Sequence, residues 1–355
     1  MTGPPAEKGK KNLADRKNLR LLLWLPVPVL LYWALRGASF REITLALGRL
    51  RPGRLALLLA LNLAFTSALA LRWIWILHGL GEKVSLRSMF GLAAARLAGF
   101  SVSYLTPGPQ FGGEPLQLFL AQRWTGLAYT RGSASLLIDR SMELAGNFAF
   151  IGLSLSALGS MAGLSLPSGF PSFIGPALLS AGLLLALVPL GYLAATFAGF
   201  RPLSALADKL PKRMRAGCRA SGITAFILAA ETEVAAYGKR PALAFAQFLL
   251  SFIAVQGLAV LELWLTLRYL DAKLAFDRTA LVLAAGKVAL YLPVPGGLGV
   301  LEATQRSLLS LLGYGPGKAL ALSAYVRLRD LFFTLGGLLA TAIGLRAPNG
   351  GGRRK

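Results

Sequence analysis

The chain has few of the residues that form disulfide frameworks and metal sites. Its 355 residues include one cysteine, Cys218, and one histidine, His78. A lone cysteine excludes an intrachain disulfide, and without Cys-His spacing the sequence predicts no metal site. Charged residues are also scarce at 15%, whereas 55% of residues are hydrophobic and the mean hydropathy is +0.59. This composition is too apolar for an ordinary soluble domain and predicts an integral membrane protein.

Motifs of nucleotide binding and nucleophilic catalysis are missing as well. We find no phosphate-binding glycine-rich loop and no serine in a nucleophile elbow. The glycines of "PGGLGV" at 295–300 do not follow a strand, which argues against a dinucleotide site. We therefore expect a protein without cofactor, metal or catalytic residues. The alternative is a membrane-embedded transferase in which Glu114 or Glu302 acts as the base on a lipid headgroup.

Long apolar runs dominate the rest of the chain. About 20 apolar residues cross the hydrocarbon core of a bilayer as a helix, and the sequence predicts an all-α polytopic membrane protein with about six such full spans. The first run is longer than the apolar core of a cleaved signal peptide, and Arg36 follows it directly, so we expect it to remain as a span. The spans are expected at Leu19–Leu35, Leu55–Leu77, Gly132–Leu158, Ser172–Ala198, Leu243–Leu270 and Leu320–Gly344.

The net charge of +23, from 38 basic and 15 acidic residues, lies mainly at the ends of the apolar runs. This is the positive-inside pattern and it also suits anionic lipids, so the charge indicates membrane lipids and no nucleic acid as partners. We expect a bacterial-type inner (plasma) membrane with both termini cytoplasmic. The arginine-rich segment 36–54 is then predicted as an amphipathic helix on the outer interface. The predicted organisation is a basic cytoplasmic N-terminus at 1–18, a membrane half at 19–200, a basic cytoplasmic interfacial linker at 201–240, a second membrane half at 241–345 and a basic cytoplasmic tail at 346–355.

Two further apolar regions are interrupted by proline and glycine and resemble each other. They contain "LTPGPQFGGEPLQ" at 105–117 and "LPVPGGLGVLE" at 292–302, and aligning their prolines places Glu114 on Glu302. Proline and glycine break a helix, and irregular backbone at membrane depth needs partners from the protein itself. We therefore predict two re-entrant helical hairpins, the alternative being ordinary turns outside the membrane. The predicted hairpin tips comprise Pro107, Gly112, Gly113, Pro293, Pro295, Gly296, Gly297 and Gly299.

Counting the crossings from the cytoplasmic N-terminus makes the first hairpin enter from inside and the second from outside. The sequence thus predicts an inverted repeat, an architecture found in many alternating-access transporters.

Ionisable residues recur within and beside the apolar regions. A charge at mid-membrane costs at least about 2.5 kcal/mol on insertion scales, so such residues usually pair and face a cavity. Carboxylates suit a cationic or hydroxylated headgroup and arginines suit a phosphate, which together predict an amphiphile-binding cavity. The alternative is a set of structural ion pairs that lock helices together. The predicted substrate-binding residues are Arg96, Glu114, Asp139, Arg140, Glu143, Lys287, Glu302, Arg306, Arg327 and Arg329.

At these same positions the chain resembles the family of lysylphosphatidylglycerol synthase transmembrane regions, and the resemblance covers nearly its whole length. The resemblance implies a lipid flippase domain. Two departures are Gln117, where the family often has arginine, and the Asp139-Arg140 pair, where it commonly has Glu-Arg. The matching motifs are "TPGPQFGGEPLQ" (106–117), "RWTG" (123–126), "IDRSME" (138–143), "PVPGGLGVLEA" (293–303) and Arg327 in "AYVRL".

The chain ends at "RAPNGGGRRK" without a soluble aminoacyl-transferring domain, so we expect a stand-alone member that moves a lipid made elsewhere. The family relationship implies several candidate lipids: anionic or aminoacylated phospholipids, polyprenyl-linked lipids and hopanoid-type lipids. Besides the transferase, one further alternative is a non-catalytic membrane partner of a lipid-modifying enzyme.

Overall fold

A computed structural model of the chain shows an all-α protein. It describes residues 41, 48, 50–106, 112–156, 174–211, 214, 223–292 and 294–346. Over these residues it contains eleven α-helices, one short 3-10 helix and no strand, so the predicted fold class is confirmed.

Five long helices correspond to five of the six predicted spans. Four of them, α4 (Pro52–Gly79), α8 (Ile174–Phe197), α12 (Pro241–Tyr269) and α15 (Pro316–Arg346), are long and apolar enough to cross a membrane. The fifth, α7 (Tyr129–Ser156), has the same 28 residues as α4 but carries several charges. The predicted span 19–35 and most of the predicted interfacial helix 36–54 lie outside the described residues.

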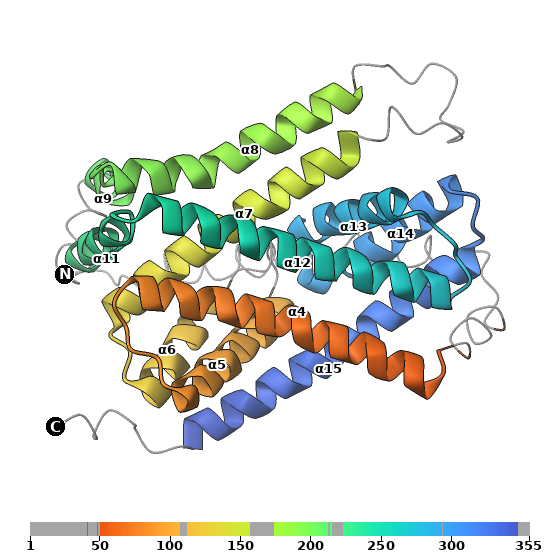
Figure 1. Ribbon diagram of the computed structural model, residues 1–355, viewed down its shortest axis with the longest axis horizontal. Helices are drawn as coiled ribbons and strands as arrows, with labels where there is room; N and C mark the ends of the chain where they lie inside the picture. The colour runs from red at the N-terminus through yellow and green to blue at the C-terminus, as the bar shows by residue number, and fades with distance from the viewer. Residues whose placement is uncertain are drawn as a thin grey trace, which may run out of the picture.

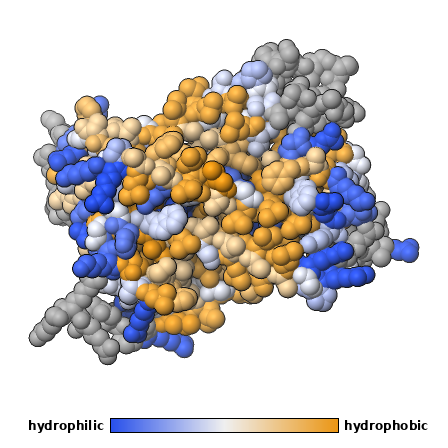
Figure 2. Space-filling model, in the orientation of Figure 1, coloured by the Kyte–Doolittle hydropathy of each residue, from blue (hydrophilic) through white to orange (hydrophobic). Residues whose placement is uncertain are grey.

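A broad apolar surface surrounds this bundle. Figure 2 shows it as a band across one face, between hydrophilic residues at the two ends. Exposed leucine, valine, isoleucine and phenylalanine side chains on α8, α12 and α15 contribute to it, among them Leu184, Val188, Ile253 and Leu339. An apolar surface of this extent is costly in water and matches the hydrocarbon core of a bilayer. The protein is therefore membrane-integral.

The first half of the chain contains a helical hairpin between two long helices. Helix α4 runs the length of the bundle, and α5 (Leu86–Leu105) then returns only to its middle (Figure 1). After the tip, α6 (Glu114–Thr125) runs back beside α5 to the end from which α5 started, and α7 then runs away from that end. The hairpin thus enters and leaves at one end of the bundle.

The second half repeats this order in the opposite direction. Helix α12 runs to the other end, and α13 (Phe276–Tyr291) returns to the middle (Figure 1). The 3-10 helix η2 (Pro295–Gly297) forms part of the tip, α14 (Val300–Leu311) runs back, and α15 follows. The two hairpins approach each other from opposite ends, which is the arrangement that the predicted inverted repeat requires.

The two halves interlock through their hairpins. Helix α5 packs on α15, α13 packs on α7, and α4 packs on α12. The first helix of each hairpin therefore contacts the long helix that follows the other hairpin, and α5 also contacts the η2 tip. A movement of one half consequently changes the surroundings of both tips.

In its described residues, the predicted linker 201–240 contains the helices α9 and α11, which pack on the bundle. Helix α9 (Pro202–Asp208) packs on α11 (Ile223–Tyr237), which in turn packs on α7 and α8. Buried Glu231 of α11 accepts hydrogen bonds from the backbone amides of Leu203 and Ser204, at 2.8 and 3.0 Å. A carboxylate at this position stabilises the first turn of α9.

We expect cysteine labelling to place the two hairpin entrances on opposite sides of the membrane. In a Cys218→Ser background, Lys83→Cys and Lys273→Cys each place one thiol in an exposed loop, before α5 and before α13 respectively. An impermeant maleimide should label Lys273→Cys in intact spheroplasts and Lys83→Cys only after permeabilisation. Labelling of both from the same side would contradict the inverted repeat.

We expect Gly113→Ala to destabilise the first hairpin. A Cβ atom at Gly113 would lie 1.8 Å from the carbonyl oxygen of Gly99, so the α5 and α6 backbones would have to separate. Such overpacking costs about 1–3 kcal/mol and should lower the melting temperature in detergent. The matched control is Gly257→Ala in α12, where a Cβ meets nothing within 4 Å. Equal melting temperatures for the two variants would contradict this packing.

Candidate functional site

A buried cluster of four charged side chains joins α4, α5 and α7. Asp139 accepts from Arg72 at 2.7 Å and from Arg96 at 2.8 Å, one guanidinium on each carboxylate oxygen. Glu143 lies one turn further along α7 and contacts the same two arginines, at 3.0 and 3.4 Å. Two arginines and two carboxylates leave this cluster neutral, which reduces the cost of burying it.

A further ion pair connects the tip of the first hairpin to α7. Arg140 lies 2.8 Å from Glu114, the first residue of α6, and 3.1 Å from Glu143. The second oxygen of Glu114 accepts the backbone amide of Gly112 at 2.8 Å. Glu114 therefore stabilises the backbone of the tip, and its ion pair with Arg140 connects the tip to the buried cluster.

The tip of the second hairpin depends on a single arginine of α15. Arg327 donates to Glu302 at 2.7 Å and to the carbonyl oxygens of Gly296 and Gly297 at 2.5 and 3.2 Å. It also donates to the Tyr104 hydroxyl of α5 at 3.0 Å. One guanidinium thus donates to two backbone carbonyls of the turn, and it joins the two halves of the molecule.

The glycines of this second tip are required by its backbone. Gly296, Gly297 and Gly299 have φ angles of 53°, 62° and 78°, a left-handed region that residues with a Cβ rarely adopt. Glu302 then accepts the backbone amide of Gly299 at 2.8 Å and caps the start of α14. The "PGGLG" sequence therefore forms a tight turn between α13 and α14.

The two tips are stabilised by the same pattern of contacts. In each, a glutamate in the first turn of the returning helix accepts a glycine amide and pairs with an arginine of the following long helix. Arg140 and Arg327 are both the twelfth residue of their helices, α7 and α15. This correspondence supports a common origin of the two halves.

A third cluster lies between α4, α12 and α15. Glu262 contacts Arg329 at 3.3 Å, accepts the Tyr325 hydroxyl at 2.7 Å and accepts the Asn62 amide at 3.3 Å. Arg329 also pairs with Asp330 at 2.8 Å. Glu262 stands as far from the end of α12 as Arg72 does from the end of α4. Equivalent positions in the two halves therefore carry charges of opposite sign.

Most of the predicted substrate-binding residues lie close together in the structure. Their charged groups pair with one another and do not line an open cavity in the described residues. Lys287 of α13 is partly exposed and donates to Asn147 at 2.9 Å. Arg306 lies one turn beyond Glu302 on α14 and is partly exposed. Pro107 and Pro293 lie outside the described residues, whereas Pro295 begins η2.

Arg72 was missed by the sequence reasoning although its signal was available. It is a single basic residue inside the apolar run 55–77, a nearly uninterrupted run that predicts a membrane span as a whole. Tyr104, Asn62 and Tyr325 also hydrogen-bond to the buried charges. Nothing in the sequence indicates these contacts, because polar residues of these types also occur at membrane interfaces.

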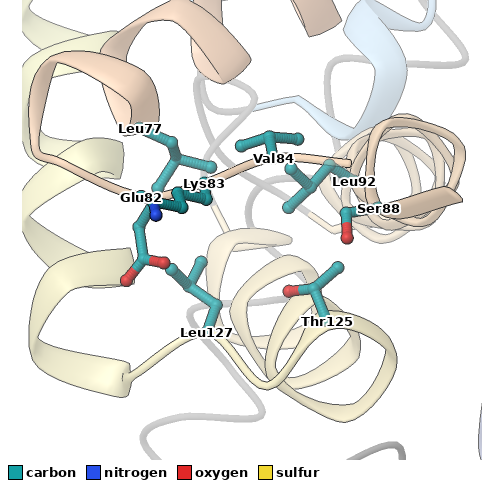
Figure 3. A pocket seen from close by; sticks show the side chains of 8 residues that line it. All are labelled: Leu77, Glu82, Lys83, Val84, Ser88, Leu92, Thr125 and Leu127. Atoms are coloured by element: carbon teal, nitrogen blue, oxygen red, sulfur yellow. The ribbon is translucent and has the colours of Figure 1, made fainter. Parts of the chain in front are cut away.

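The pocket shown in Figure 3 does not contain the ion-pair clusters. It lies at the entrance of the first hairpin, lined by Leu77, Val84, Leu92 and Leu127 with polar residues at its edge. Glu82, which lines the pocket, forms an ion pair with Arg131 of α7 at 2.8 Å. Among the described residues, no group of three histidine, cysteine or acidic side chains could hold a metal ion.

The family comparison agrees with the motifs that form both tips. A sequence model of the lysylphosphatidylglycerol synthase transmembrane region matches residues 20–337. The chain belongs to this family. Comparison with curated proteins and with solved structures yields no significant match. In this family member, both Pro-Gly motifs, both tip glutamates and both tip arginines fall within the matched residues.

We expect Arg327→Met to be strongly destabilising. The variant leaves the buried carboxylate of Glu302 without its cation and removes the side-chain donor to two tip carbonyls. Removing one partner of a buried ion pair typically costs about 3–5 kcal/mol, which should be visible in thermal unfolding in detergent.

The double variant Arg327→Met with Glu302→Gln tests whether the unpaired charge causes that loss. It should recover part of the stability, because a neutral amide replaces the unpaired carboxylate. Additive effects of the two substitutions would show that the charge pairing is not what stabilises the tip.

Proposed function

We propose that this protein moves a phospholipid or another amphiphilic lipid between the leaflets of the membrane. The observation that carries the proposal is the meeting of two broken helical hairpins, entering from opposite ends, at Arg327 and Tyr104. Inverted repeats with broken helices at mid-membrane are typical of alternating-access transporters. Membership of the family supports the same function, since the resemblance implies a flippase domain.

The ion pairs supply a physical basis for two states. Arg327 connects the second tip to α5 of the other half, and Arg140 connects the first tip to the buried cluster. A polar headgroup that competes for these side chains exchanges one set of charge-assisted hydrogen bonds for another. Such an exchange lets the tips move without leaving a buried charge unpaired. In this proposal the arginines and glutamates predicted as substrate-binding residues also control the tips.

The proposed substrates are anionic or aminoacylated phospholipids, polyprenyl-linked lipids or hopanoid-type lipids. The proposed location is the inner (plasma) membrane with both termini cytoplasmic, because basic residues gather in the termini and the 201–240 linker. A lipid-modifying enzyme would be the natural partner, since it would supply the lipid that is moved. No catalytic role is proposed for the described residues.

We expect Glu302→Gln to slow lipid movement while the protein still folds. A glutamine oxygen can still accept the Gly299 amide, and Arg327 keeps its bonds to Tyr104 and to the tip carbonyls. Loss of the charged partner should reduce the rate about tenfold, as expected for one charge-assisted hydrogen bond. The measurement is dithionite quenching of fluorescent lipids in proteoliposomes.

The matched control is Asp277→Asn, an exposed carboxylate in the first turn of α13. It should leave both the rate and the yield unchanged. If Glu302→Gln fails to fold, Glu302 has a structural role instead. Mass spectrometry of lipids from expressing cells distinguishes the transferase: a new lipid species would replace transport as the function.

A further inference from the structure

The charges of the third cluster, formed by Glu262, Arg329 and Asp330, do not balance. Among the described residues, Arg329 is the one cation in contact with either carboxylate, at 3.3 Å from Glu262 and 2.8 Å from Asp330. Glu262 exposes 6% of its surface and Asp330 exposes 8%. With both carboxylates ionised, this cluster carries one negative charge in excess. The four-residue cluster around Asp139, in contrast, is neutral.

A comparison of the two halves shows how this excess arises. Glu143 and Asp330 are both the fifteenth residue of their helices, α7 and α15. Glu143 contacts one guanidinium from α4 and one from α5. The position in α12 that corresponds to the α4 arginine holds Glu262, and the eleventh residue of α13, which corresponds to the α5 arginine, is Gly286. The second half therefore lacks both cations and has a further carboxylate instead.

The place of the cluster makes an excess charge costly. Asp330 stands halfway along the 31-residue helix α15, which crosses the whole bundle (Figure 1). A net charge at mid-membrane depth is unfavourable unless a partner compensates it. A hard metal ion would need about six or more oxygen ligands, whereas here a guanidinium already lies between the two carboxylates. A proton needs one carboxylate oxygen and no cavity.

The hydrogen bonds of the cluster indicate which oxygen can take that proton. Glu262 uses both of its oxygens: Oε1 accepts from Tyr325 and Asn62, and Oε2 accepts from the guanidinium of α15. Asp330 accepts both of its bonds from Arg329 on Oδ1. Within the described part of the chain, nothing donates to its Oδ2. A hydrogen on this oxygen breaks none of these bonds and makes the cluster neutral.

Other ionisable groups on the neighbouring helices do not pair with Asp330. Within the described ranges, no cation besides Arg329 lies at ion-pair distance from its carboxylate. Tyr104 lies within electrostatic reach of Asp330, and its hydroxyl accepts from Arg327. The groups of this region are Tyr104 of α5, Tyr325 and Arg327 of α15, Glu302 and Arg306 of α14, and Lys287 of α13, whose ammonium contacts Asn147 of α7.

We propose that Asp330 binds one proton in each transport cycle and couples lipid movement to the proton gradient. A proton from the water on one side binds to Oδ2, and the neutral side chain fits the closed cluster of this structure. Release of the proton to the water on the other side leaves an ionised carboxylate, which favours an arrangement of α15 that brings it to water. Arg327 stands one turn before Asp330, so this shift reaches the second tip. The inference rests on the proposed lipid transport and adds its driving ion.

The first test measures the leaflet distribution of fluorescent phosphatidylglycerol in proteoliposomes of the full chain, with and without an imposed pH difference. Coupling to one proton should shift this distribution about tenfold per pH unit. Asp330→Asn keeps an acceptor for Arg329 but can no longer bind or release the proton. In this variant the distribution with the pH difference should equal that without it. Asp330→Glu should retain part of the dependence.

The matched control is Asp277→Asn, which removes an exposed carboxylate from the first turn of α13 and should keep the full dependence on pH. Glu262→Gln removes the excess charge from the other carboxylate. Asp330 then has Arg329 as its own counter-charge and stays ionised, so the dependence should be lost in this variant too. Glu262→Gln keeps the test valid if Asp330→Asn fails to fold.

The second test is infrared difference spectroscopy of the full chain in lipid, which requires no transport. The unchanged protein and Asp277→Asn should show the carbonyl band of a buried, protonated carboxylic acid. This band should be missing from Asp330→Asn and from Glu262→Gln.

The outcomes separate the proton site from the proposed function. Lipid movement that ignores the pH difference, in a protein without the carboxylic acid band, would overturn the proton site and leave lipid transport standing. The band without any lipid movement would support the proton site and overturn the transport that it is proposed to drive. A pH dependence that survives both Asp330→Asn and Glu262→Gln, or a response to a sodium gradient in its place, would overturn the assignment to Asp330.

Discussion

Backbone groups in the interior of a bilayer need hydrogen-bond partners from the protein, and this requirement organises the whole molecule. Two helices are broken at the centre of the bundle, and each break exposes amides and carbonyls. Glu114 and Glu302 accept the amides, whereas Arg327 donates to the carbonyls of Gly296 and Gly297. The buried charges are therefore connected to the broken backbone, and neither would be stable in lipid without the other.

The interlocking of the halves follows from the same requirement. A half-length hairpin cannot bury its own tip, so α5 lies against α15 and α13 lies against α7. The partner of each hairpin comes from the opposite half. The stability of each tip therefore depends on the opposite half, and an isolated half would expose the polar groups of its tip.

Much of this arrangement could be predicted from the sequence, because membrane proteins give strong local signals. The Pro-Gly motifs indicated both breaks, and the charges around Asp139 and Arg327 indicated where the buried clusters lie. The pairing of these charges could not be predicted, since it depends on which helix faces are adjacent. Arg72 illustrates the limit: a single charge in a long apolar run does not reveal that it faces Asp139 across 67 residues of sequence.

The pairing of the buried charges has an electrical consequence. A membrane potential acts on each elementary charge with about 2.3 kcal/mol per 100 mV. Arg72, Arg96, Asp139 and Glu143 together carry no net charge. The field therefore does almost no net work on this cluster when its four side chains shift together along the membrane normal. A single unpaired arginine at the same depth would instead make the position of its helix sensitive to voltage.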